Sequence, residues 1–292
     1  MWRNLQLARM KLQDVESTIL LLNNIPQDDF CGLTPSEVHH ILYYPYGKES
    51  PLQFQKNIDD SVLDGIPFFR LTEEFLKILQ RDKRIKLTPL GALPKKVMVE
   101  LYSHGFILEE YIESGIVKLT REHDCISISS VAIVSRLAGL IKMQYGRYFL
   151  TKAGEKFMLP NNRVRFFKKV FQTFTEKFDW SLNDGYPQDI AQLGWAYSVL
   201  VLNKFGDQER TLDFYARLYS KAFPILTKYF LNAQYAYSTP EIMLNRCYEI
   251  RTFERFLEWF GLVKIQRIST LIPSDRDIIN RSGLIKRLFI FD

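Results

Sequence analysis

The chain has 292 residues, of which 47% are hydrophobic and 25% are charged, proportions that indicate a folded protein with a core and exclude a disordered chain. The formal net charge is +6, and because no stretch of about 18 uninterrupted apolar residues occurs, we expect no membrane-spanning segment. The three cysteines (Cys31, Cys125 and Cys247) are far apart and no apolar leader is visible, which favours reduced thiols in the cytoplasm.

The first residues predict an amphipathic helix over 2–22. Its apolar residues recur at alternating steps of three and four and therefore form one stripe: Leu5, Ala8, Leu12, Val15, Ile19 and Leu22. This pattern is typical of a terminal helix that packs on the body of a protein. It also fits a short dimerisation seam with a second copy of the chain.

A second helix is expected to begin at Thr34, because Thr34, Pro35 and Glu37 match the N-cap, first-position and first-turn preferences of helices. It should end at Tyr44, since the residue before a proline disfavours the helical conformation. Residues 44–51 then predict a loop.

Two segments, 70–94 and 131–154, resemble each other. Each predicts a helix, a tight turn, a short strand and a Thr-x-x-Gly closure. Five residue pairs share one constant spacing, which indicates an internal repeat: Ile78 with Ile141, Arg84 with Arg147, Leu87 with Leu150, Thr88 with Thr151, and Gly91 with Gly154. A third copy is expected near the C-terminus, where residues 261–264 match residues 139–142, with its returning strand within 283–292.

A helical block is expected between the second and third copies. Residues 163–178 place five apolar side chains on one helix face: Phe167, Val170, Phe171, Phe174 and Phe178. Residues 189–206 are apolar nearly all round and predict a helix in the middle of the core. Pro224 should break the next helix, and Thr239 with Pro240 should begin another.

Residues 129–151 predict a winged helix, in which a helix enters the major groove of DNA and the following hairpin contacts the backbone. The helix is expected over about 129–140, with Ser129 or Ser127 as its cap. The hairpin should turn at Tyr145–Gly146, where the glycine supplies the positive φ that a tight turn requires. Ser130 and Arg136 are the candidate groove residues, and the candidate phosphate contacts are Arg84, Lys142, Arg147 and Lys152.

Basic charge concentrates around these segments: residues 70–96 hold eight Lys and Arg against three Asp and Glu, and residues 118–152 hold six against two. A concentrated positive surface attracts polyanions. The expected helix nevertheless carries only one charge, whereas a DNA-reading helix usually has more donors on its outer face. Winged helices also serve as protein-interaction modules, so both alternatives remain open.

Together these patterns predict a mainly α protein with small β-hairpins, in which two or three winged-helix-like modules pack on a helical block. The expected division is an N-terminal helix (1–30), a first module (31–115), a second module (116–160), the helical block (161–250) and a third, degenerate module (251–292).

Three stretches also carry a family resemblance: "GLTPSEVHHILYYPY", "KLTPLGALP" and "GLIKMQYGRYFLTKAGEKF". Over roughly residues 32–180 the chain resembles the C-terminal region of plasmid-borne open-reading-frame proteins that are passengers of insertion elements. The resemblance implies a bacterial, mobile-element context and brings no catalytic residues. This chain lacks the Cys-x-Cys and His-Cys zinc motif that some members carry.

The sequence contains no Gly-rich phosphate loop, no His-Glu-x-x-His and no Cys-x-x-Cys motif. His39 and His40 are adjacent and would point about 100° apart on a helix, and His123 with Cys125 would need further ligands to hold a metal. We therefore expect no catalytic residues, cofactor or metal.

The expected function is that of a cytoplasmic, non-enzymatic interaction or regulatory protein, with a protein partner or a second copy of itself. The first alternative is DNA binding through basic wings. The second is an enzyme whose site is assembled between modules.

Overall fold

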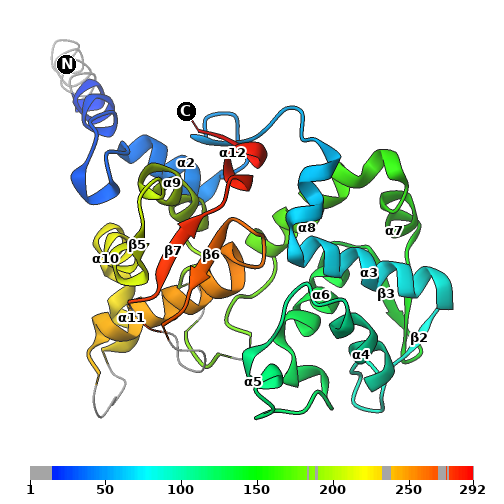
Figure 1. Ribbon diagram of the computed structural model, residues 1–292. Helices are drawn as coiled ribbons and strands as arrows, with labels where there is room; N and C mark the ends of the chain where they lie inside the picture. The colour runs from blue at the N-terminus through cyan, green and yellow to red at the C-terminus, as the bar shows by residue number, and fades with distance from the viewer. Residues whose placement is uncertain are drawn as a thin grey trace, which may run out of the picture.

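The computed structural model describes residues 15–182, 184–187, 190–231, 238–268, 274 and 276–291. Over these residues the chain is mainly helical and carries three small antiparallel sheets, which confirms the predicted class (Figure 1). None of the helices in this part of the chain has both the length and the apolar character that crossing a bilayer requires.

Residues 67–150 form a compact unit, called here the first unit, in which one helix, one strand, two further main helices and a hairpin follow each other. The hairpin strands pair with each other, and the first strand pairs with the second strand of the hairpin, so the sheet order is β2-β4-β3. The elements are α3 (Pro67–Asp82), β2 (Ile85–Lys86), α4 (Lys95–Ser103), the short α5 (Glu110–Glu113) and η3 (Glu122–Asp124), α6 (Ile126–Leu137), β3 (Ile141–Gln144) and β4 (Arg147–Leu150).

The shared sheet changes the interpretation of the expected repeat. Ile85 lies opposite Tyr148 and Lys86 opposite Arg147, so the two segments expected to be separate copies are neighbouring parts of one sheet. Ile78 is in a helix, whereas its expected counterpart Ile141 is in a strand. The constant spacing between these segments therefore does not relate equivalent positions, and the boundary expected at 115/116 falls inside the first unit.

Residues 195–281 form a second unit with the same order of main elements. Its sheet order, β5-β7-β6, corresponds strand for strand to that of the first unit. The elements are α9 (Trp195–Phe205), β5 (Arg210–Thr211), α10 (Leu212–Ala222), η5 (Pro224–Phe230), α11 (Pro240–Tyr248), which continues as the π-helix η6 (Glu249–Leu257), β6 (Val263–Gln266) and β7 (Ile278–Arg281).

The turn that leads into each hairpin is the same in both units. Gly139 and Gly261 both have positive φ, at 73° and 68°, as expected where a helix ends in a left-handed residue. The next residue, a leucine in each unit, donates its N–H to a carbonyl five positions earlier: Leu140 to Ser135 at 2.9 Å and Leu262 to Leu257 at 2.8 Å. The match between residues 139–142 and 261–264 therefore relates equivalent positions.

The returning strand of the second unit is not the one expected within 283–292. That role belongs to β7, whose Ile279 is fully buried opposite Ile265. Residues 283–292 contain instead α12 (Leu284–Leu288) and β8 (Phe289–Phe291), which pairs with β1 (Leu52–Phe54) near the other end of the chain. The expectation was wrong because Phe289 finds its aromatic partners on Phe54 and Phe171, outside the second unit.

The helix α8 (Arg163–Glu176) lies between the two units (Figure 1). The ring of Phe174 contacts Phe68 of the first unit and Phe260 of the second, each with a centroid separation of 5.1 Å. The five residues predicted on one face of this helix are all buried. One continuous aromatic core therefore joins both units through α8.

Local signals in the sequence correctly predicted several helix ends. The side chain of Thr34 accepts from the backbone N–H of Glu37 and begins α2 (Pro35–Tyr43), and Thr239 caps α11 in the same way. As expected, the helix that precedes Pro224 ends there, and α9 lies in the core. The start of α6 was wrong: the helix begins at Ile126 and Ser129 is inside it. The remaining short elements are η1 (Asp28–Phe30), η2 (Asp60–Gly65), α7 (Lys152–Phe157) and η4 (Pro160–Asn162).

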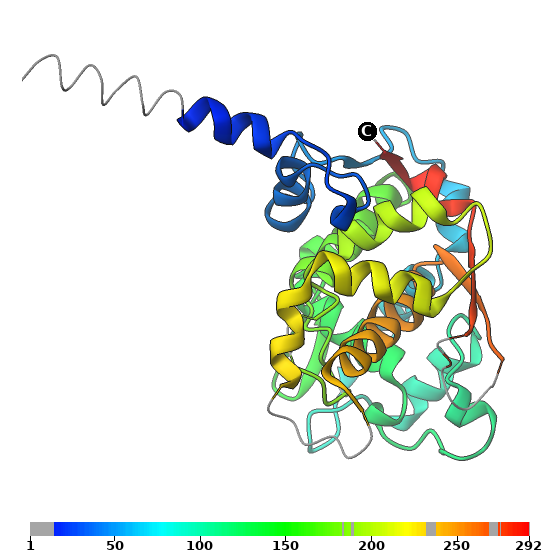
Figure 2. The same cartoon turned by 90° about the vertical axis from the view of Figure 1, so that its left-hand side faces the viewer.

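Residues 15–23 are helical and project from the body of the protein (Figure 2). The part of the predicted stripe that the structure describes is exposed: Val15 at 57%, Ile19 at 50% and Leu22 at 56%. Packing of this helix on the body is therefore not observed for residues 15–23. The rest of the stripe, residues 5–12, lies outside the described residues.

The Thr-x-x-Gly closure at residues 151–154 fastens the hairpin of the first unit to α7. Thr151 donates its N–H to the Leu140 carbonyl at 2.9 Å, and its Oγ1 accepts from the N–H of Gly154 at 3.0 Å. A Cβ atom on Gly154 would overlap the Leu140 carbonyl oxygen. Only a glycine lets these two backbone segments approach so closely.

We expect Gly154→Ala to lower the free energy of unfolding by about 2 kcal/mol, because the added methyl group forces the hairpin and α7 apart. Urea denaturation followed by circular dichroism measures the loss. Gly283→Ala is the matched control, since Gly283 has an ordinary helical φ of −62° and a Cβ there meets nothing within 4 Å. Equal stability of the two variants would contradict the close approach.

Candidate nucleic-acid interface

The outer face of the first unit's sheet is basic. Lys86 lies opposite Arg147, Arg147 lies opposite Gln144, and Lys142 lies opposite Phe149. Directly opposed residues of neighbouring strands project from the same side of a sheet, and side chains alternate along each strand. The buried Ile85 and Tyr148 therefore occupy the inner side. Lys86, Lys142 and Arg147, called here the basic wing face, share the outer side.

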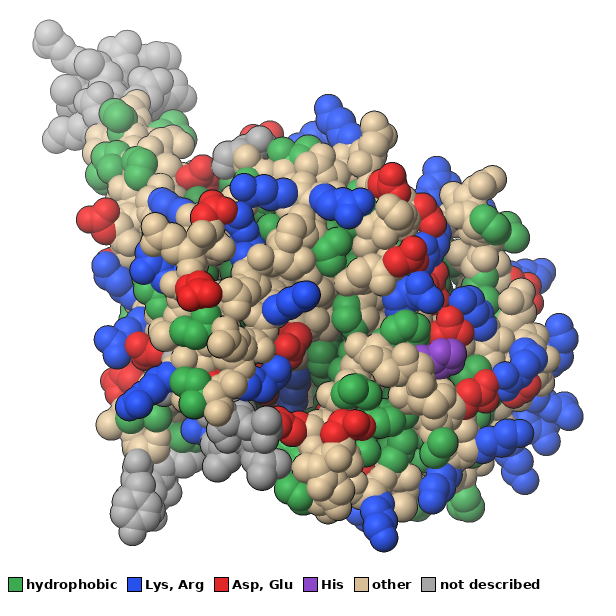
Figure 3. Space-filling model, viewed as in Figure 1, with side chains coloured by type: hydrophobic (Ala, Val, Ile, Leu, Met, Phe, Trp, Pro, Cys, Tyr) green, Lys and Arg blue, Asp and Glu red, His purple; other side chains and the backbone are tan. Residues whose placement is uncertain are grey.

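Further cations flank the basic wing face. Arg84 immediately precedes β2, and Lys152 is the first residue of α7 after β4; both are exposed. Among the described residues, none of these five cations takes part in an ion pair. Figure 3 shows Lys and Arg side chains gathered at the right-hand edge of the molecule, over β2 and the end of α3. This surface thus offers positive charge that none of the described acidic side chains neutralises by an ion pair.

The tip of the hairpin is a tight turn that a neighbouring segment supports. Tyr145 and Gly146 form a two-residue loop in which both residues have positive φ, at 51° and 65°, as in a type I′ turn. The N–H of Leu87, which follows β2, donates to the Gly146 carbonyl at 2.9 Å. Through this hydrogen bond, the residue that follows β2 supports the turn from one side. The side chain of Tyr145 is 88% exposed.

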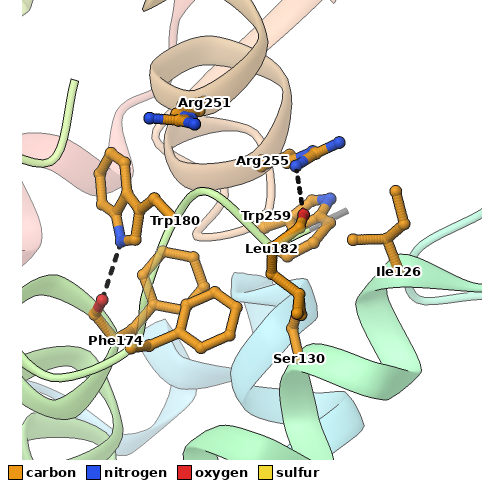
Figure 4. Close-up of a pocket in the computed structure, with 9 residues that line it drawn as sticks. Ile126, Ser130, Phe174, Trp180, Leu182, Arg251, Arg255 and Trp259 are labelled. Atoms are coloured by element: carbon orange, nitrogen blue, oxygen red, sulfur yellow. Dashed lines mark hydrogen bonds between the residues drawn. The ribbon is translucent and has the colours of Figure 1, made fainter. Parts of the chain in front are cut away.

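Ser130, predicted to lie in a DNA groove, is buried instead. It lines a small internal cavity of about 10 Å³ together with Phe174, Trp259 and Leu182 (Figure 4). Its Oγ finds no hydrogen-bond partner in the part of the chain that the structure describes. Ser130 cannot reach a nucleic acid while the protein is folded, so its expected role is corrected.

The same burial extends over most of α6. Eight of its residues are buried, since the helix packs against α3 on one side and α8 on another. Its two exposed residues, Arg136 and Leu137, lie at its C-terminal end, and Ile126 and Ile133 are half-buried. Because α8 occupies one side of α6, this helix has no free face with which to enter a major groove. The first unit therefore exposes its hairpin, and not the length of α6, on its surface.

The outer sheet face of the second unit carries different side chains from that of the first unit, although the strands are equivalent. The positions that correspond to Lys86 and Arg147 are held by Thr211 and Ile278, which lie opposite each other. Lys264 lies opposite Asn280 and corresponds to Lys142. It is the one cation on the outer side of the paired strands β5, β6 and β7. Basic charge at these positions is thus a property of the first unit and not a consequence of the fold.

The cysteines and histidines do not come together as a site. Burial, reinforced by the nearby Glu109 carboxylate, raises the pKa of the Cys125 thiol to about 12, and burial raises the pKa of Cys247 to about 12 as well. Thiols of this kind are poor nucleophiles at neutral pH. His104 stacks on Phe106, and His123 lies 3.6 Å from Asp124. Within the described ranges no three His, Cys, Asp or Glu side chains are grouped as metal ligands.

An open groove of about 590 Å³ lies beside α2, lined by the C-terminal end of α8 and by residues 192–195. It contains the carboxylates of Glu176 and Asp179 next to Lys177, and burial raises the pKa of Glu176. No histidine or cysteine is among the described residues that line it. The charged side chains that line this groove are thus mixed in sign.

Sequence reasoning predicted Arg84, Arg136, Lys142, Arg147 and Lys152, all of which reach solvent to some degree. It missed Lys86 and Tyr145 as site residues. The alternation of the buried Ile85 with the exposed Lys86 was a usable signal, but the strand that pairs with Lys86 is distant in the sequence. Comparison with protein-family models, curated proteins and solved structures finds no match to this chain, so the interface is defined by its own geometry.

Proposed function

We propose that this chain is a non-enzymatic interaction protein that binds nucleic acid through the basic wing face of its first unit. The observation that carries the proposal is the placement of Lys86, Lys142 and Arg147 on one solvent-facing side of a sheet, with no ion pair to any described residue. Three cations held within one small surface match the regular charges of a phosphate backbone.

The order of elements supports a winged-helix-like interpretation of both units. In each, a helix, a strand, two main helices and a hairpin follow in sequence, and the first strand joins the edge of the hairpin. In this proposal the chain holds two such units, joined by α8, and the hairpin β3–β4 is the wing. A fold does not determine a function. We therefore assign nucleic-acid binding to the first unit because its outer sheet face is basic and that of the second unit is not.

The proposed contact is to the phosphate backbone and not to base edges in the major groove. Contacts to phosphates position a protein without reading sequence, whereas sequence is read through base edges. The burial of Ser130 and of most of α6 removes the donors that such reading requires. We therefore expect little sequence preference.

The test is fluorescence anisotropy with a random-sequence duplex and with a single strand of the same length, at about 50 mM and about 200 mM salt. If about three phosphates are neutralised, duplex affinity should fall roughly 40-fold between these salt concentrations. The expected result is micromolar binding at low salt that weakens with this slope. An absence of binding at low salt would overturn the proposal.

A second candidate function is self-association through the projecting helix. Val15, Ile19 and Leu22 are exposed on one predicted stripe, and a seam of this spacing is completed by a second copy of the same helix. We expect light scattering to report a dimer for the wild type and a monomer for Ile19→Glu/Leu22→Glu. Ser17→Glu, a change at a neighbouring exposed position outside the stripe, should remain dimeric. A wild-type monomer at about 100 μM would exclude this seam.

A further inference from the structure

Tyr145 occupies a position that its residue type does not favour. A type I′ turn requires positive φ at both central residues, and Asn followed by Gly is the preferred pair. Tyr145 adopts a φ of 51°, which costs about 1 kcal/mol for a side chain that has a Cβ. At 88% exposure, the ring recovers little of this cost by burial in the protein. A strained and exposed aromatic residue at the tip of a braced hairpin is a reason to look for a ligand.

We propose that Tyr145 stacks on an unpaired base, so that the protein prefers single-stranded nucleic acid, or a junction of single and double strand, over a continuous duplex. This inference rests on the proposed function, because it takes the phosphates to lie on the basic wing face. The ring at the tip then contacts the base that belongs to the bound backbone. Stacking of this kind is tolerant of sequence, because every base has a flat face.

The geometry favours an unpaired base for a simple reason. In a continuous duplex both faces of each internal base are already covered by its neighbours, so an aromatic ring finds a free face only at an end, a junction or a single strand. Arg147 directly follows the turn and Lys142 lies three residues before Tyr145, on the strand that leads to it. Cations therefore lie on both strands below the ring, where the phosphates on either side of a stacked base can be held.

The braced turn also lowers the entropic cost of binding. Gln144 pairs with Arg147 across the hairpin, and the Leu87 N–H holds the Gly146 carbonyl, so the backbone of the tip is fixed before a ligand arrives. A tyrosine has only two side-chain torsions to order. Preorganised aromatic contacts retain more of their interaction energy as affinity.

Tyr145→Asn is the decisive variant, because it removes the ring and installs the residue that the turn prefers. We expect its thermal stability to equal or exceed that of the wild type. Its affinity for a single strand of about 16 nucleotides should fall about tenfold, while its affinity for a closed circular duplex, which has no end for the ring to stack on, stays within about twofold. Tyr145→Phe should retain the preference for the single strand, since the ring remains.

Tyr43→Ala is the matched control. Tyr43 is also an exposed tyrosine, at 67%, but it lies on α2, across the molecule from β3 (Figure 1). Its loss should leave both affinities unchanged. A single strand carrying 2-aminopurine reports stacking directly: its fluorescence should be quenched by the wild type and by Tyr145→Phe, and not by Tyr145→Asn.

The outcomes separate this inference from the function on which it rests. If the wild type binds the duplex with the expected salt dependence and Tyr145→Asn binds both probes like the wild type, stacking is refuted and the basic wing face stands. Equal losses on both probes would also refute a specific contact to an unpaired base. If the wild type binds neither probe, the proposed function and the stacking inference are both overturned.

Discussion

Arg251→Met should lower the free energy of unfolding by about 3–5 kcal/mol. The side chain of Arg251 is completely buried, and that of its partner Asp184 is 2% exposed, so the substitution leaves a carboxylate inside the protein without its main counter-charge. Arg255 also approaches Asp184, at 3.3 Å, but makes a single contact with it. Removal of one partner of a buried pair is costly because the other keeps its desolvation penalty.

The guanidinium of Arg251 holds a whole connecting segment, which explains the size of the effect. It forms a bidentate pair with Asp184 at 2.7 and 2.8 Å, and it donates to the carbonyls of Tyr186, Pro187 and Ile190. Burial by itself opposes the charge, yet the pKa of Arg251 lies above its ordinary value because the Asp184 carboxylate stabilises the charged form. These contacts fix the connection between α8 and α9, and with it the junction of the two units.

Chemical denaturation provides the measurement, and an exposed pair provides the control. Arg217 and Asp213 form an ion pair on the surface of α10, with Arg217 75% exposed, so Arg217→Met should cost less than about 0.5 kcal/mol. The double variant Asp184→Leu/Arg251→Met should recover part of the loss, because no buried carboxylate is left without its partner, and Arg255, the other cation that contacts Asp184, is 17% exposed and reaches solvent. A loss for Arg251→Met no greater than that for Arg217→Met would show that the buried pair does not hold this junction.

Features of the fold that depend on neighbouring residues were predictable from the sequence. Thr34 and Thr239 carry their capping signal within three residues, and Pro45 and Pro224 restrict the backbone wherever they occur. The Tyr145–Gly146 turn was visible for the same reason. The sheet partners were not predictable, because β2 has only two residues and its pairing with β4 is a long-range contact. The apparent repeat between these two segments therefore suggested two modules where the structure has one sheet.

The residues of the candidate site also fall into those that local sequence predicts and those that depend on long-range contacts. The exposure of Lys142 and Arg147 follows from the hairpin alone, so local reasoning placed them correctly on a hairpin. Ser130 was misplaced because its burial depends on α8, which covers α6 from a different part of the chain. Lys86 was missed since only the pairing of β2 brings it beside Arg147. Local sequence patterns thus identify the hairpin, and long-range packing decides which of its neighbouring residues are exposed.

Reversal of charge on the basic wing face should remove nucleic-acid binding without loss of stability. We expect Lys86→Glu/Lys142→Glu/Arg147→Glu to weaken binding to a duplex by at least about 100-fold at about 50 mM salt, because three phosphate contacts become repulsions. The salt dependence should also disappear, since its slope counts the neutralised phosphates. These side chains form no ion pair with any described residue, so the melting temperature should stay close to that of the wild type.

Lys264→Glu is the matched control for this triple variant. Lys264 occupies the position in the second unit that Lys142 occupies in the first, on an equivalent strand and on the same side of its sheet. If the first unit alone binds, Lys264→Glu should change affinity by no more than about twofold, whereas Lys142→Glu alone should weaken it by about tenfold. Equal effects of these two single changes would mean that binding follows the overall charge of the protein and not its wing. Unequal effects would assign different roles to two units with one topology, because the surface charge differs where the fold does not.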